Sequence, residues 1–160
     1  MLAQRVVSII VLAPLVLYIV NIWEVWYLLL VPAGSMVGIR EFYSLLQRAE
    51  HRPLWPFGLL LTLAFIIDAG ISLVPAARIQ PGQIAFPALA FTIILSLGYL
   101  LTRRDLNGSL LDWSLTWVPP LYCGFLLSYL ISLRLLPEGD RWMYMLLGVT
   151  WATDIAAYAT

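Results

Sequence analysis

Near the end of the chain, one carboxylate lies inside an apolar stretch that is long enough to form a membrane-spanning helix. The residue is Asp154, in the segment Trp142–Thr160. At helical spacing Trp151, Asp154 and Tyr158 share one face, and Thr150 lies one turn before the carboxylate. A carboxylate in such a run is costly unless it binds or pairs with something, so it indicates a functional site.

The chemistry that this face offers is the binding of a metal ion and of phosphate groups. Carboxylate oxygens suit Mg²⁺, which typically binds one or two carboxylates together with substrate phosphates. We therefore predict that Asp154 is a catalytic and metal-ligating residue. The hydroxyl of Thr150 and the aromatic rings of Trp151 and Tyr158 are its predicted substrate-binding neighbours. The alternative is that Asp154 only forms an ion pair with an arginine of another helix.

Two other carboxylates interrupt apolar segments, and for both we predict a structural role. Asp68 is followed closely by Gly70, where a helix is expected to end, and a carboxylate at the end of a span costs little. Glu41 is expected to pair with Arg40, with Arg48 or with a residue elsewhere in the chain.

The remaining reactive side chains form no recognisable catalytic set. His51 is the only histidine, so it cannot build a metal site by itself, and we expect it to be solvated or to face a phosphate. It has no base-orienting partner nearby in sequence, which argues against a Ser-His-Asp arrangement. Cys123 is expected to be a small buried side chain. The Gly34–Gly38 segment lacks the lysine and the spacing of a phosphate-binding loop, and helix packing explains its small residues better.

The composition indicates that these residues are positioned by helices in a membrane. Hydrophobic residues make up 62% of the chain and charged residues 11%, and the mean hydropathy is +0.90. A soluble domain is closer to half apolar and a quarter charged. All nine basic residues are arginine and are balanced by nine carboxylates, so the net charge suggests no nucleic-acid partner.

Charged residues divide the chain into segments of about the length that crosses a bilayer. The expected spans are Arg5–Glu24, Val25–Leu46, Arg52–Arg78, Arg78–Arg103, Asp112–Arg134 and a last helix from Trp142. The predicted fold is therefore an all-α, polytopic integral membrane protein with about six transmembrane helices in one domain, residues 1–160. Prolines within the spans predict that some helices are kinked, at Pro14, Pro32, Pro87, Pro119 and Pro120.

The distribution of arginines predicts the orientation in the membrane. If the spans alternate, six arginines lie on the side of the N-terminus and three on the other side. The positive-inside rule then places the N-terminus in the cytoplasm. At about 1.5 Å per helical residue, Asp154 lies about 18 Å below Trp142, in the cytoplasmic half of the bilayer.

The segment Trp151–Tyr158 resembles the W-x-x-D-x-x-A-Y element of the phosphatidate cytidylyltransferases, also called CDP-diacylglycerol synthases. Weaker features agree in order along the chain: Arg5, Glu41 with Phe42 and Tyr43, Leu121–Gly124, and Leu133 with Arg134. The resemblance implies transfer of a cytidylyl group from CTP to phosphatidic acid, with release of pyrophosphate and formation of CDP-diacylglycerol. It also implies a divalent cation, Asp154 as one acidic member of the site, and a location in a bacterial inner membrane.

The chain departs from the family pattern in ways that bear on activity. Ile155 replaces the usual threonine and Ala156 the frequent glycine. The family continues beyond this element with a Gly-rich, Lys-bearing segment and a signature rich in Lys, Asp, His and Gly. We therefore expect the chain to be the amino-terminal portion of a longer enzyme. As an isolated fragment it is expected to be inactive, with a carboxy-terminal half or a second copy as its partner.

Two other functions remain open at this point. A small transporter or channel subunit would use Asp68 and Asp154 as an ion or proton relay, and it predicts two similar halves, which we do not find between residues 1–75 and 76–160. A non-catalytic membrane scaffold would use Gly34, Gly38 and Gly124 for helix packing.

Overall fold

All regular secondary structure in the described part of the chain is helical. The computed structural model describes residues 14, 16–18, 20–21, 24–71, 74, 78–102 and 108–159. The predicted all-α class is thereby confirmed. The chain forms two compact units: a central unit, residues 30–131, and a terminal unit, which combines residues 1–29 with residues 132–160.

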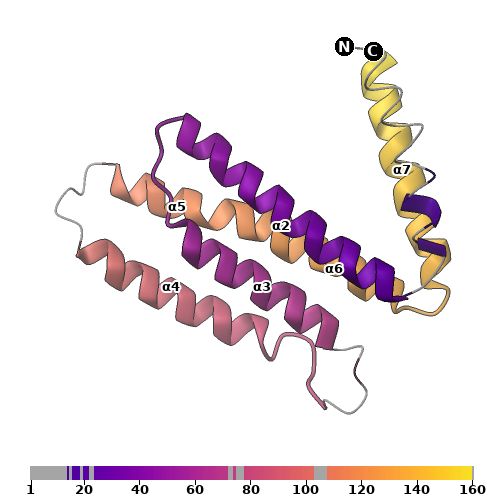
Figure 1. The fold of residues 1–160 in the computed structure, drawn as a ribbon, viewed down its shortest axis with the longest axis horizontal. Helices are drawn as coiled ribbons and strands as arrows, with labels where there is room; N and C mark the ends of the chain where they lie inside the picture. Colours follow the sequence, from indigo (N-terminus) through magenta and orange to yellow (C-terminus); the bar gives the residue numbers. More distant parts are fainter. Residues whose placement is uncertain are drawn as a thin grey trace. The chain divides into compact units, whose positions relative to one another are not determined.

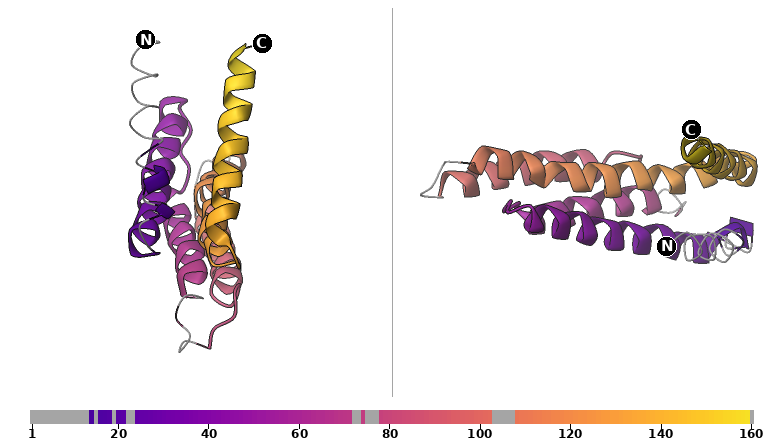
Figure 2. Two further views of the ribbon diagram at one scale, coloured as in Figure 1. Left: turned by 90° about the vertical axis from the view of Figure 1, so that its right-hand side faces the viewer. Right: turned by 90° about the horizontal axis from the view of Figure 1, so that it is seen from above.

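The helices of the central unit run lengthwise beside one another (Figures 1 and 2). The elements, in chain order, are α2 (Glu24–Arg48), α3 (Trp55–Ile71), α4 (Ala85–Leu101), α5 (Ser109–Pro119), the π-helical segment η2 (Pro120–Leu126), α6 (Leu127–Arg134) and α7 (Gly139–Ala159). Three parts of this series belong to the terminal unit: α2 up to Leu29, α6 from Ser132, and all of α7.

The helix boundaries confirm some of the predicted spans and shift others. The second helix continues through Arg40 and Glu41 as expected, and it ends at Arg48. The fourth is shorter than expected because it begins only at Ala85, and the last begins at Gly139, one turn before Trp142. Most of the predicted first span, Arg5–Glu24, lies outside the described residues.

One continuous helical run among the described residues is long and apolar enough to cross a membrane by length and composition. It is Ser109–Arg134, which comprises α5, η2 and α6. Helices α3 and α4 are also apolar but have 17 residues each. The predicted arrangement of about six spans therefore stays a prediction.

Helix α3 lies at the centre of the central unit and contacts α4, α5 and η2. Small residues allow the closest approaches. A Cβ atom at Gly124 of η2 would lie 3.0 Å from the Cα atom of Thr62 on α3. One turn earlier on α3, a Cβ atom at Gly58 would overlap the ring and hydroxyl of Tyr43 from α2. Glycine at position 124 lets the backbones of η2 and α3 approach closely. Glycine at position 58 makes room for the side chain of Tyr43 against α3.

The double proline at the end of α5 widens the helix instead of ending it. Pro120 has no N–H, so it cannot donate to the carbonyl four residues earlier, that of Thr116. The hydroxyl of Tyr43 donates to this carbonyl at 2.7 Å, and the chain continues as the π-helical segment η2. A side chain from a neighbouring helix thus satisfies the backbone group that the proline leaves without its usual partner.

Pro87 does not disturb its helix either. It is the third residue of α4, within the first turn, where the backbone N–H groups have no intrahelical partner in any case. Pro87 therefore lies at the start of α4, and the kink predicted at this position is not found.

The terminal unit, residues 1–29 and 132–160, contains α7. A Cβ atom at Gly139 would overlap the carbonyl of Arg134, so glycine allows the tight turn between α6 and α7. Glu138, which has a left-handed backbone with φ of 57°, binds Arg141 at 2.7 Å. The hydroxyl of Tyr27 contacts the sulfur of Met143 at 3.5 Å, and both side chains are buried.

Candidate functional site

The predicted site residues all lie on the second half of α7, which is helical without interruption through Ala159. Trp151 is half-buried and Asp154 is exposed. The hydroxyl of Thr150 donates to the carbonyl of Leu146 on its own helix at 2.9 Å, so towards a ligand this oxygen can act only as an acceptor. The position of Tyr158 is on the helix, but its side chain lies outside the described residues.

Asp154 forms no hydrogen bond or ion pair with any described residue. The alternative role for it, an ion pair with an arginine, is therefore not found in this part of the chain. No three His, Cys, Asp or Glu side chains that could hold a metal ion come together among the described residues. This face of α7 presents one free carboxylate beside a half-buried indole ring.

The second carboxylate within an apolar helix, Asp68, has a structural role. Its carboxylate accepts hydrogen bonds from the backbone N–H groups of Gly82 at 2.6 Å, Ile84 at 2.8 Å and Ala85 at 3.2 Å. These groups lead into the first turn of α4, where N–H groups lack intrahelical partners. Asp68 on α3 thus caps α4 from outside that helix, and it is buried. This role argues against Asp68 as a relay group in a transporter or channel subunit, which leaves Asp154 as the one carboxylate proposed for that function.

The structure corrects the predicted environments of Glu41, which lies within α2, and of His51, which follows it. Glu41 is exposed and forms no ion pair with any described residue, so the predicted pairing is not found. His51 is not simply solvated, since its Nδ1 atom lies 3.6 Å from a carboxylate oxygen of Asp112. Asp112 also accepts a hydrogen bond from the backbone N–H of Arg52 at 3.0 Å.

Thr116 completes the attachment of this connection to α5. Its hydroxyl accepts a hydrogen bond from the backbone N–H of Leu54 at 2.8 Å and donates to the carbonyl of Asp112 at 2.9 Å. The connection between α2 and α3 is therefore fixed at two points along α5. These pairs are about 60 residues apart in sequence, and no local pattern signals them.

The predictions for the small residues are partly confirmed. Cys123 is buried and packs with Ile39 and Tyr43, as expected for a small apolar side chain. Gly38 faces Cys123, whose sulfur would lie 3.3 Å from an added Cβ atom. Gly34, in contrast, faces open space, so packing within the described residues does not explain it.

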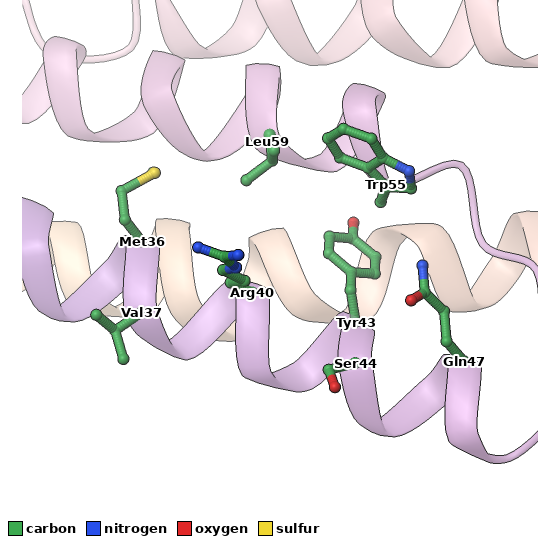
Figure 3. A pocket seen from close by; sticks show the side chains of 8 residues that line it. All are labelled: Met36, Val37, Arg40, Tyr43, Ser44, Gln47, Trp55 and Leu59. Carbon is green, nitrogen blue, oxygen red and sulfur yellow. The ribbon is translucent and has the colours of Figure 1, made fainter.

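A groove that sequence reasoning did not identify lies between α2 and α3. Its volume is about 730 Å³, and it is lined by Met36, Val37, Arg40, Tyr43, Ser44, Gln47, Trp55 and Leu59. In Figure 3 the side chain of Arg40 points from α2 into the space below Leu59 of α3. The sequence signals only the wall formed by α2, where Arg40, Ser44 and Gln47 recur about one helical turn apart within an apolar helix. The wall formed by α3 has no such signal.

Comparison with protein families identifies the chain. The model of the cytidylyltransferase family matches residues 3–160. The chain belongs to the phosphatidate cytidylyltransferase family. Membership supports CTP-dependent cytidylyl transfer, with CTP as a substrate, and places the chain among the nucleotidyltransferases. Neither the curated proteins nor the solved structures give a significant match.

The match to the phosphatidate cytidylyltransferase family includes both surfaces described above, the α7 face and the groove between α2 and α3. It therefore does not single out either one as the site of the reaction. The free carboxylate of Asp154 and the cation of Arg40 are the two charged groups that these surfaces present.

Proposed function

We propose that this protein transfers a cytidylyl group from CTP to phosphatidic acid. A phosphate oxygen of the lipid attacks the α-phosphorus of CTP, a new P–O bond forms, and the bond from the α-phosphorus to the bridging oxygen breaks. The products are CDP-diacylglycerol and pyrophosphate. The observation that carries this proposal is the family match over residues 3–160, which supports the CTP-dependent transfer. The choice of phosphatidic acid rests on the likeness of Trp151–Tyr158 to the element of that family.

Asp154 is the proposed ligand for a divalent cation, Mg²⁺ or a similar ion. Its carboxylate is exposed and has no partner in the described part of the chain, so it is available to a ligand. Because Mg²⁺ is often held by one or two carboxylates together with substrate phosphates, a single aspartate fits as one member of the set. When bound, the cation neutralises charge on the reacting phosphates and on the leaving pyrophosphate.

The neighbours of Asp154 would position the substrates. Trp151 and Tyr158, one turn before and one turn after the carboxylate, offer aromatic surface to the nucleotide or the lipid, and the oxygen of Thr150 can accept a hydrogen bond. The chain contains no lysine. The described residues place no second or third metal-ligating side chain with Asp154. We therefore propose that further metal and nucleotide ligands come from a carboxy-terminal half or from a second copy of the chain.

The same proposal includes an integral membrane location. Apolar side chains are exposed along α4, among them Phe86, Phe91 and Ile94, as expected for a helix surface in contact with lipid. The excess of arginines on one side supports an N-terminus in the cytoplasm of a bacterial cell, with Asp154 in the cytoplasmic half of the inner membrane. Phosphatidic acid would reach this depth from the bilayer, and CTP from the cytoplasm.

The test is the conversion of CTP and phosphatidic acid in membranes that contain the complete gene product. We expect Asp154→Asn to lower turnover by about 100-fold, the usual loss when one group that stabilises transition-state charge is removed. Asp140→Asn is the matched control, because Asp140 is an aspartate in the first turn of the same helix. Equal turnover in the two variants would remove Asp154 from the site.

A further inference from the structure

The groove between α2 and α3 combines an apolar end with an end that is rich in hydrogen-bond donors. Met36 and Val37 lie at one end, and Gln47 and Trp55 lie at the other (Figure 3). Arg40 is between them. A ligand that follows this groove meets apolar side chains first, then a guanidinium group, then polar groups near the connection between α2 and α3.

The donors of the groove are free to bind a ligand. The side chains of Arg40, Ser44, Gln47 and Trp55 form no hydrogen bond or ion pair with any described residue. Tyr43 is different, because its hydroxyl is already donated to the carbonyl of Thr116. Guanidinium, hydroxyl, amide and indole groups can each donate a hydrogen bond to an anion.

The charge of the lining selects the kind of ligand. Among the described residues that line the groove, Arg40 is the one charged side chain, and no carboxylate is present. Glu41 follows Arg40 directly but is exposed and does not line the groove. A headgroup with an ammonium group would find no counter-ion here, whereas a phosphate monoester can accept a charge-assisted hydrogen bond from the guanidinium group of Arg40.

We propose that this groove binds the phosphate of phosphatidic acid at Arg40, with one acyl chain along Met36, Val37 and Leu59. The volume of about 730 Å³ accommodates a glycerol phosphate and the first part of an acyl chain. A nucleotide triphosphate fits less well, because it carries several negative charges and the groove supplies one cation. The choice of phosphatidic acid among phosphate-bearing lipids rests on the proposed function.

The test is photo-crosslinking of the complete gene product in phosphatidylcholine nanodiscs. The probe is phosphatidic acid with a diazirine in one acyl chain, added without CTP, and the labelled peptides are located by mass spectrometry. We expect labelling at Met36, Val37 or Leu59, and we expect unlabelled phosphatidic acid to compete. Equal competition by phosphatidylcholine would overturn the proposal, and so would full competition by CTP or inorganic phosphate.

Variants separate the role of Arg40 from general electrostatic attraction. Arg40→Gln should lower specific labelling about tenfold, because a charge-assisted hydrogen bond to phosphate is lost, and Arg40→Lys should restore part of it. Arg48→Gln is the matched control, since Arg48 ends the same helix and does not line the groove. An equal loss in Arg40→Gln and Arg48→Gln would contradict the proposal.

A second variant leaves Arg40 in place. Val37 lines the groove and is 66% exposed, so a polar side chain is tolerated there. Val37→Glu puts a carboxylate one turn from Arg40, where it would pair with the guanidinium and lower labelling as Arg40→Gln does. Unchanged labelling in Val37→Glu would contradict the assignment of Arg40.

Turnover of CTP, measured in the same nanodiscs, separates this inference from the proposed function. Turnover without labelling of the groove would overturn the groove assignment and leave the proposed function standing. Specific labelling without turnover would leave the groove assignment standing and count against the proposed function.

Discussion

The contact between Tyr43 and Gly58 makes a quantitative prediction about stability. A Cβ atom at Gly58 would overlap the hydroxyl and ring of Tyr43. The ring is buried and cannot swing away without breaking its 2.7 Å hydrogen bond to the carbonyl of Thr116. Overpacking typically costs about 1–3 kcal/mol, and the lost hydrogen bond costs about 1 kcal/mol. The higher helix propensity of alanine offsets about 1 kcal/mol of this cost. Gly58→Ala should therefore lower the free energy of unfolding by about 1–3 kcal/mol.

The assay is reversible unfolding of the complete gene product in mixed micelles, followed by circular dichroism. Gly98→Ala is the matched control, because Gly98 is also within a helix and faces open space; it should be neutral or stabilise by up to about 1 kcal/mol. In the Tyr43→Phe background, Gly58→Ala should cost about 1 kcal/mol less than in the wild type, because the hydroxyl is absent. Equal costs in both backgrounds, or equal effects of Gly58→Ala and Gly98→Ala, would refute the reasoning.

Two further predictions concern carboxylates with structural roles. Asp68→Ala removes the acceptor of three backbone hydrogen bonds and should destabilise the protein by about 2 kcal/mol. Amide exchange at Gly82, Ile84 and Ala85 should become faster. Unchanged exchange at these amides would contradict the capping role. Asp112→Ala should speed amide exchange at Arg52, whose N–H it binds, while the N–H of Leu54 stays protected by Thr116. Equal acceleration at Arg52 and Leu54 would show that the two attachments are not independent.

Local pattern was sufficient to predict the helical class and the general order of the helices. The apolar runs around Asp68 and after Asp112 correspond to α3 and to the helix through η2, and Cys123 is buried as expected. The predicted first residue of a helix is less accurate where a side chain from another helix determines it. Helix α4 begins at Ala85 because Asp68, on another helix, binds the N–H groups there.

Some functional features can be predicted from the sequence and others cannot. Asp154 stands out because its own helix is apolar, which is a local signal. The attachment of His51 and Arg52 to Asp112 depends on two segments about 60 residues apart, and the groove at Arg40 depends on how α2 lies against α3. Neither follows from the periodicity of a single segment, because each requires the relative position of two helices.

The central claim is that this chain takes part in cytidylyl transfer to a lipid phosphate through the carboxylate on α7. The most direct measurement is the formation of CDP-diacylglycerol from CTP and phosphatidic acid in membranes with the complete gene product, comparing wild type, Asp154→Asn and Asp140→Asn. We predict product with the wild type and with Asp140→Asn, and about 100-fold less with Asp154→Asn. Product formation by Asp154→Asn at the rate of the wild type would contradict the account.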